Sequence, residues 1–161
     1  MDMNIYIKIL ADTFMKKNVL LEEIIELNKT QDEILTSSEV NIEMFNIIID
    51  RKEKVILQLN QLDDGFEKIY NKVQESLKND TINYRTEVIF LQELIKQIMD
   101  KSINIQTQEK SNKLKLETFF MNQKQEIKTY KVSSQTVSNY YKNMMNEFQG
   151  ESYFLPMNFI K

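Results

Sequence analysis

The chain contains no cysteine and no histidine among its 161 residues. The absence of cysteine excludes disulfides and thiolate metal sites. The absence of histidine removes the commonest general base and metal ligand, and it excludes the Glu-x-x-His motif of di-iron bundles. There is also no glycine-rich phosphate loop. We therefore expect a protein that is not an enzyme and that holds no metal or other cofactor.

Glycine, proline and arginine are scarce. The chain has two glycines and one proline, whereas β-rich folds need turn residues about every ten positions. This scarcity predicts few, long helices. Arginine occurs only at Arg51 and Arg85, and the net charge is −3. The sequence therefore lacks the basic footprint that nucleic acids or anionic membranes require.

Long apolar runs are missing as well. No run approaches the roughly 20 residues that span a bilayer, and the first residues lack a basic start followed by an apolar block. Apolar residues make up 42% of the chain and charged residues 28%, which is typical of globular proteins. We expect a cytoplasmic protein with no membrane insertion.

A heptad seam is the main feature that is present. Its positions alternate three and four residues apart, which is the spacing of a helix that packs along other helices. Eight of its nine residues are apolar, and Lys52 is the exception. The seam consists of Phe45, Ile48, Lys52, Val55, Leu59, Leu62, Phe66, Ile69 and Val73.

The apolar periodicity predicts an all-α fold, namely an antiparallel bundle of three long helices with coiled-coil-like packing plus a short C-terminal helix. The long helices are expected at about residues 3–35, 38–77 and 82–131, with Ser38 as an N-cap. The second helix is kept whole across Gly65, with a bend there at most. Residues 1–132 then form the bundle, and residues 133–161 form a short amphipathic helix and an apolar tail.

The single polar residue of the seam predicts a specific contact. Folding the second helix on the third about residue 80 brings position n opposite roughly 160 − n, so Lys52 meets Glu109. Gln108 or Asn112 is expected to join them. A buried polar pair of this kind fixes the register of a coiled coil. A functional polar site, or a Lys52 side chain that reaches solvent, are the alternatives.

The third helix is expected to outrun its neighbour near residue 120, because it spans up to roughly 75 Å against roughly 58 Å for the second. An exposed apolar patch marks a contact surface, and methionine and tyrosine suit adaptable recognition. Residues 116–155 are therefore candidates for partner binding, with ordinary core or dimer packing as the alternative. The candidate residues are Phe119, Phe120, Ile127, Tyr130, Val137, Tyr140, Tyr141, Met144, Met145 and Phe148.

Two adjacent carboxylates, Asp63 and Asp64, precede Gly65. Neighbouring residues on a helix point in different directions, so they do not form a catalytic pair. We interpret both as solvated side chains on a helix surface.

The chain resembles one known family. The stretch IIIDRKEKVILQLNQLDDGFEKIY (residues 47–70) looks like the central helix of FlgN-type flagellar export chaperones, with the Lys52-Glu53 pair followed by Leu59 and Leu62. The acidic-apolar repeat LLEEIIELNKTQDEIL (residues 20–35) resembles the first helix of that family, and SNYYKNMM (residues 138–145) resembles its aromatic C-terminal end. The tail YFLPMNFIK (residues 153–161) has no counterpart there.

The resemblance implies an ATP-independent chaperone of flagellar type III export. Such a protein binds C-terminal helices of hook-associated proteins of the hook–filament junction, prevents premature assembly, and delivers them to an export gate component. Two alternatives stay open: a FliT-type filament-cap chaperone, and a structural or tethering coiled-coil protein that oligomerises through its seam, for example as a homodimer.

Overall fold

The computed structural model describes residues 3–79 and 82–122, and every regular element in them is a helix. The helices are α1 (Met3–Thr36), α2 (Ile42–Asp63), α3 (Phe66–Asn79) and α4 (Arg85–Asn122). The predicted all-α class is confirmed for these residues. The predicted short C-terminal helix lies outside the described residues.

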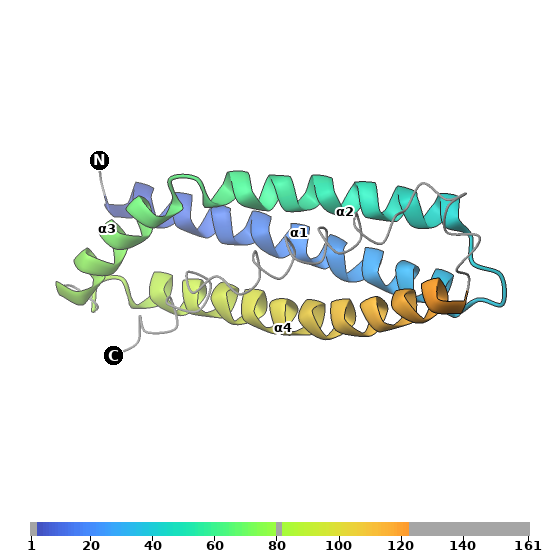
Figure 1. The fold of residues 1–161 in the computed structure, drawn as a ribbon. Coiled ribbons are helices and arrows are strands. Elements are labelled where there is room, and N and C mark those ends of the chain that lie inside the picture. Colours follow the sequence, from blue (N-terminus) through green and yellow to red (C-terminus); the bar gives the residue numbers. More distant parts are fainter. Residues whose placement is uncertain (1–2, 80–81, 123–161) are drawn as a thin grey trace.

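Three of the helices run side by side, as Figure 1 shows. α1 and α4 point in the same direction, and α2 runs opposite to both. Hydrogen bonds between α1 and α4 join residues that are 76 to 84 positions apart in the sequence. This separation stays nearly constant along the two helices, as it does only in a parallel pair. α1 makes the most extensive contacts with the other helices, and α4 is its principal neighbour.

Buried positions on α1 and α4 alternate three and four residues apart. This spacing keeps one stripe of each helix facing its partners, as in a coiled coil. Most of these side chains are aliphatic or aromatic, but each stripe also contains polar members. The buried stripes are Ile7, Leu10, Phe14, Lys17, Leu21, Ile24, Asn28 and Gln31 on α1, and Val88, Leu91, Ile95, Ile98, Ser102, Ile105, Glu109, Asn112 and Leu116 on α4.

The start of α2 differs from the sequence prediction. Its N-cap is Asn41 and not Ser38, because the Asn41 side chain accepts a hydrogen bond from the backbone N–H of Met44 at 3.0 Å. This bond satisfies one of the N–H groups that a helix start leaves without a partner. α4 likewise begins at Arg85, three residues after the predicted start at Ile82.

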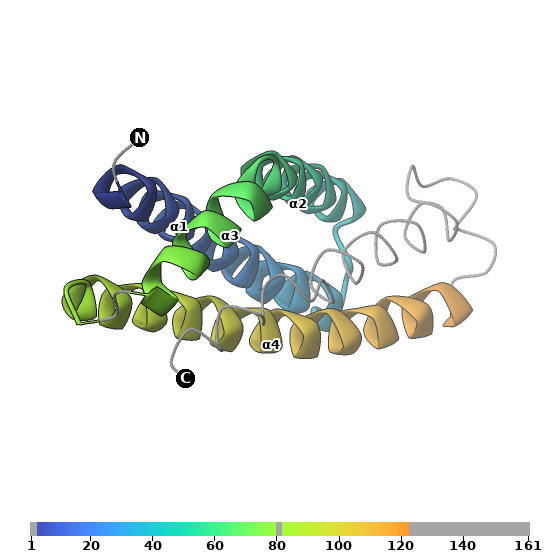
Figure 2. The ribbon, with the colours of Figure 1, turned by 90° about the vertical axis from the view of Figure 1, so that its left-hand side faces the viewer.

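The prediction of one helix from residue 38 to 77 is wrong. α2 ends at Asp63, and Gly65 adopts a φ of +77°, which lies in the left-handed region that ends helices. α3 then crosses the end of the bundle from α2 towards α4 (Figure 2). Phe66 and Val73 of the seam still face the core from this differently directed helix, but Tyr70 is buried there and the seam residue Ile69 only partly so.

An ion pair stabilises this corner. Lys17 of α1 is buried, pairs with Asp63, and lies 4.8 Å from the ring centroid of Phe66. The interpretation of Asp63 as a solvated carboxylate is therefore wrong, whereas Asp64 is exposed. The partner of Asp63 was not evident from sequence because it comes from the first helix.

Replacing Gly65 with alanine is expected to lower the free energy of unfolding by about 1–2 kcal/mol, because an L-residue in the left-handed region is strained. No atom lies within 4 Å of an added Cβ, so the backbone conformation alone accounts for the effect. Urea denaturation measures it, with Gly65→Asn as a control that should lose less because asparagine tolerates this region. Stabilisation by alanine would instead indicate a continuous α2–α3 helix in solution.

Candidate functional site

The outer surface of α1 is bordered by two grooves, one towards α2 and one towards α4. Val19 lies between them, is 68% exposed, and contributes to both. The two grooves differ in their lining residues: four of the seven on the α2 side are apolar, whereas four of the six on the α4 side are charged.

The groove between α1 and α2 has a volume of about 510 Å³. Met15 and Val19 of α1 are four residues apart, which aligns them along one side of the groove. Met15 is 47% exposed although it lies in the middle of a long helix. Apolar side chains in such numbers at an open surface are typical of a contact site. The lining residues are Met15, Lys16, Val19 and Leu20 from α1, and Gln58, Gln61 and Leu62 from α2.

An ion pair joins α1 to α2 one helical turn along α1 from Val19. Arg51 of α2 bonds Glu23 of α1 through two of its guanidinium nitrogens, and both side chains are partly exposed. One and two helical turns further towards the start of α2, Ile47 and Met44 are exposed as well. The α1/α2 edge thus continues to offer apolar side chains beyond the ion pair.

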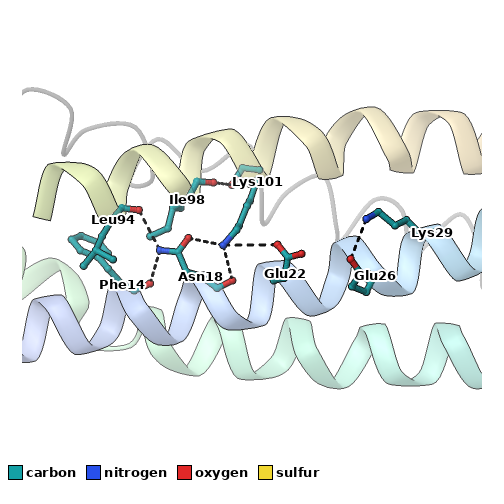
Figure 3. A network of polar contacts seen from close by, with 9 residues as sticks. Phe14, Asn18, Glu22, Glu26, Lys29, Leu94, Ile98 and Lys101 are labelled. Atoms are coloured by element: carbon teal, nitrogen blue, oxygen red, sulfur yellow. Dashed lines mark hydrogen bonds and ion pairs between the residues drawn. The ribbon is translucent and has the colours of Figure 1, made fainter. Parts of the chain in front are cut away.

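The groove between α1 and α4 is built from polar contacts, which Figure 3 shows. Asn18 donates to the carbonyl oxygens of Phe14 and Leu94, at 3.1 and 3.3 Å, and so joins the two helices. The Lys101 ammonium lies 3.2 Å from Asn18 Oδ1 and 3.9 Å from Glu22. Glu26 completes the acidic rim and pairs with Lys29 one turn along. These charges partner one another, so this groove fits a structural role.

A polar layer crosses the interior of the bundle. The Lys52 ammonium is 2.6 Å from Glu109 Oε1, and the two side chains are 0% and 1% exposed. This is the contact that the seam predicts. Its further partner is Gln31 of α1, whose Oε1 accepts from Lys52 at 2.9 Å. Lys52 does not reach solvent.

The two residues that were expected to join the pair bind α1 at the same level instead. Asn112 donates to the carbonyl oxygen of Asn28 at 3.1 Å, and Gln108 accepts from the Asn28 side chain at 3.1 Å. Sequence reasoning missed Asn28 and Gln31 because it considered only the hairpin of the second and third predicted helices. The signal was present, since both occupy seam positions of α1 that are otherwise mostly apolar.

Burial lowers the pKa of Lys52 from 10.5 to about 8, and the nearby Glu109 carboxylate partly offsets this shift. Between these two values the unfolded chain binds more protons than the folded chain, so stability rises with pH. Burial raises the pKa of Tyr70 above 10.0, and this titration lowers stability above pH 10. The window in which Lys52 dominates is therefore pH 8 to 10.

Between pH 8 and 10, we expect the unfolding free energy of the wild type to rise relative to a Lys52→Met/Glu109→Leu variant, by at most about 1.4 kcal/mol per pH unit. Urea titrations at half-unit pH steps measure the difference, which cancels the titration of surface lysines common to both proteins. Below pH 7 Lys52 is protonated in both the folded and the unfolded chain, so it should no longer change the difference in unfolding free energy between the two proteins. A constant difference from pH 7 to 10 would contradict the lowered pKa.

The predicted partner-binding residues are only partly within the described structure. Phe120 is 9% exposed and belongs to the core, and Phe119 is half-buried beside it, with ring centroids 5.9 Å apart. The predicted exposed overhang therefore does not include Phe120, which packs in the hydrophobic core. The remaining candidates lie outside the described residues, namely Ile127, Tyr130, Val137, Tyr140, Tyr141, Met144, Met145 and Phe148.

The apolar groove itself was missed from sequence. Met15 and Val19 lie outside the 3/4 stripe of α1, so the heptad pattern assigns them to solvent. An apolar pair spaced four residues apart on the outer face of an otherwise charged helix was the available signal.

Within residues 3–79 and 82–122, no group of three or more acidic side chains is arranged to hold a metal ion. Over the same residues, no helix combines the length and apolar character needed to cross a membrane.

Comparison of the chain with family models, curated proteins and solved structures found no match.

Proposed function

We propose that this protein is a FlgN-type flagellar export chaperone that acts in the cytoplasm without ATP. Its clients are C-terminal helices of hook-associated proteins of the hook–filament junction, which it keeps unassembled and passes to the export gate. The proposal rests on the resemblance of residues 20–35 and 47–70 and on one structural observation. That observation is the exposed apolar groove between α1 and α2 on an otherwise charged helical scaffold.

The groove suits an amphipathic helix. A helix that binds in this way places side chains at i, i+3, i+4 and i+7 into a hydrophobic depression. Met15, Val19 and Leu62 provide the apolar surface, and Gln58 and Gln61 provide hydrogen-bonding groups at its edge. The volume of about 510 Å³ accommodates several aliphatic side chains and not a whole domain.

A groove of this kind explains release without ATP. Binding energy comes from apolar area at an open surface, at about 25 cal/mol for each Å² removed from water. A competing surface at the export gate that buries the same client side chains therefore suffices to displace the client. This protein needs no nucleotide site for such an exchange.

The test is binding to peptides that correspond to C-terminal helices of hook-associated proteins, measured by fluorescence anisotropy. A Met15→Asp/Val19→Asp variant is expected to bind about a hundredfold more weakly, because two groove contacts are replaced by charges. The matched control is Ile5→Asp, because Ile5 lies on the same helix, is 47% exposed like Met15, and does not line the groove. The control should bind as the wild type does.

The outcomes separate the function from the site. If no hook-associated helix binds the wild-type protein, the chaperone function is wrong. If the wild type binds and the double variant binds equally well, the function stands and the groove is not the site. A FliT-type role predicts instead that helices of the filament-cap protein bind more tightly than those of hook-associated proteins.

A further inference from the structure

α4 has a second heptad row on the face opposite its buried stripe. From Thr86 to Leu114 the row lies two residues before each position of the buried stripe, and it keeps the same alternation of three and four residues as far as Met121. All of its members are exposed. They are Thr86, Ile89, Glu93, Lys96, Asp100, Ile103, Thr107, Lys110, Leu114, Glu117 and Met121.

The row contains more large apolar residues than a surface with no partner requires. Ile89, Ile103, Leu114 and Met121 are each more than half exposed, and Met121 reaches 70%. α4 lies at the edge of the bundle in both views, with one side turned away from α1 and α2 (Figures 1 and 2). A heptad row on an outer face is the pattern through which helices of separate chains associate.

We propose that two copies of this chain associate through this row, with their α4 helices antiparallel and a two-fold axis between residues 101 and 102. In this register the numbers of opposing residues add up to 203. Ile89 then meets Leu114 of the second copy, and on either side of the axis Ile103 meets Asp100. Glu93 meets Lys110 of the second copy. The symmetry repeats each of these pairs, as it does in any isologous interface.

The charges select this arrangement over its alternatives. A parallel pair in register would place Glu93, Lys96, Asp100 and Lys110 each against its own copy, and like charges at facing positions are destabilising. An antiparallel pair shifted by one heptad would place Glu93 opposite Glu117 and Lys96 opposite Leu114. That shifted pair also offers Asp100–Lys110 and Ile89–Met121 contacts, but its Glu93–Glu117 contacts are repulsive. The opposite shift pairs Lys96 with Asp100 but brings no two apolar residues of the row together. Of these registers only the proposed one has two Glu–Lys pairs, no like-charge pair and an Ile–Leu contact, so charge complementarity favours a second copy as the occupant.

This interface is independent of the proposed client site. The apolar groove is formed by α1 and α2, and none of its lining residues belongs to α4. A dimer formed through α4 therefore leaves the groove open in both copies. A variant that blocks dimerisation is expected to bind client peptides with unchanged affinity. If the dimer proposal is wrong, the chaperone proposal is therefore not affected.

Single-cysteine cross-linking tests the register directly, because the natural chain has no cysteine. Ile103→Cys mixed with Asp100→Cys should form a disulfide-linked mixed dimer under mild oxidation. Ile89→Cys mixed with Leu114→Cys should form a mixed dimer, whereas Leu114→Cys alone should not. A self-linked Leu114→Cys dimer would show a parallel pair and overturn the proposal. Absence of cross-linking by every variant would also overturn it.

Charge reversal supplies a second test by analytical ultracentrifugation. Glu93→Lys is expected to weaken dimerisation by about tenfold or more, because it turns two attractive pairs into two repulsive ones. Adding Lys110→Glu should restore the wild-type association, because the pair then has the opposite sign. Lys113→Glu, which is exposed on α4 outside the row, is the matched control and should change little. A monomeric wild type, or no rescue in the double variant, would refute the antiparallel pairing.

Discussion

Replacing Lys52 with methionine is expected to lower the free energy of unfolding by about 3–5 kcal/mol. The reason is that the Glu109 carboxylate stays in the core after the lysine that neutralises it has been removed. This carboxylate is 1% exposed, and the ammonium 2.6 Å away is the charge that pairs with it. A buried carboxylate without its cation must either stay charged in the interior or bind a proton, and both cost free energy.

The double variant Lys52→Met/Glu109→Leu is expected to regain this loss and to be as stable as the wild type, or up to about 4 kcal/mol more stable. Both charges are then absent, and apolar side chains of similar size fill the layer. Urea denaturation at pH 7 measures all three proteins. A single variant within 1 kcal/mol of the wild type would show that water reaches this layer in solution.

The same comparison tests the role of the pair in alignment. If Lys52 and Glu109 fix the register of α2 against α4, the double variant should keep its stability but populate more than one register. Apolar layers allow this because one helix can shift along the other without leaving a charge unpaired. Line broadening and multiple amide signals in NMR spectra would report this loss. A single sharp set of signals would mean that the apolar layers alone fix the register.

Replacing Phe14 with alanine is expected to cost about 3–5 kcal/mol, because a large side chain in the core is removed. Phe14 is 3% exposed and meets the ring of Phe66 edge-to-face, with centroids 5.5 Å apart. Phe66 in turn stacks on Tyr70 at 5.7 Å. The substitution therefore removes the contact by which α1 supports both the corner at Gly65 and the start of α3.

The loss of stability in Phe14→Ala should be uneven along the chain. Hydrogen exchange is expected to show the largest loss of protection in α3, because that helix is short and docks on α1 through these rings. Met15→Ala is the control, since Met15 is the next residue on the same helix and is half exposed; it should change stability by less than about 0.5 kcal/mol. Equal loss of protection in α2 and α3 would indicate that the two helices unfold as one unit.

Much of the fold was predictable from local patterns. The 3/4 spacing of apolar residues located α1 and the long helices after it, because the period of burial on a helix depends only on its geometry. The Lys52–Glu109 contact followed from a register count. α2 and α4 run in opposite directions, and the two residues are almost equally far from residue 80 in the sequence. The corner at Gly65 did not follow, because the same heptad pattern suits both a straight helix and one that turns and packs again.

The candidate site illustrates the same limit. A sequence pattern states which residues face inwards, but it does not state which outward faces become neighbours. Met15 on α1 and Leu62 on α2 lie 47 positions apart, and only the packing angle of the two helices makes them walls of one groove. Phe120 shows the reverse case, because an apolar residue expected to be exposed is buried in the core.

The sequence by itself determined that this protein is helical, that its long helices pack along seams, and that one lysine and one glutamate face each other inside. These properties depend on periodicity and on residue counts, which are local or one-dimensional. Only the tertiary structure decided that α1 is the central helix, that Lys17 holds the corner through Asp63, and that an apolar groove opens between α1 and α2. These properties depend on which faces of distant segments meet, and that choice is made by the packing of the whole core.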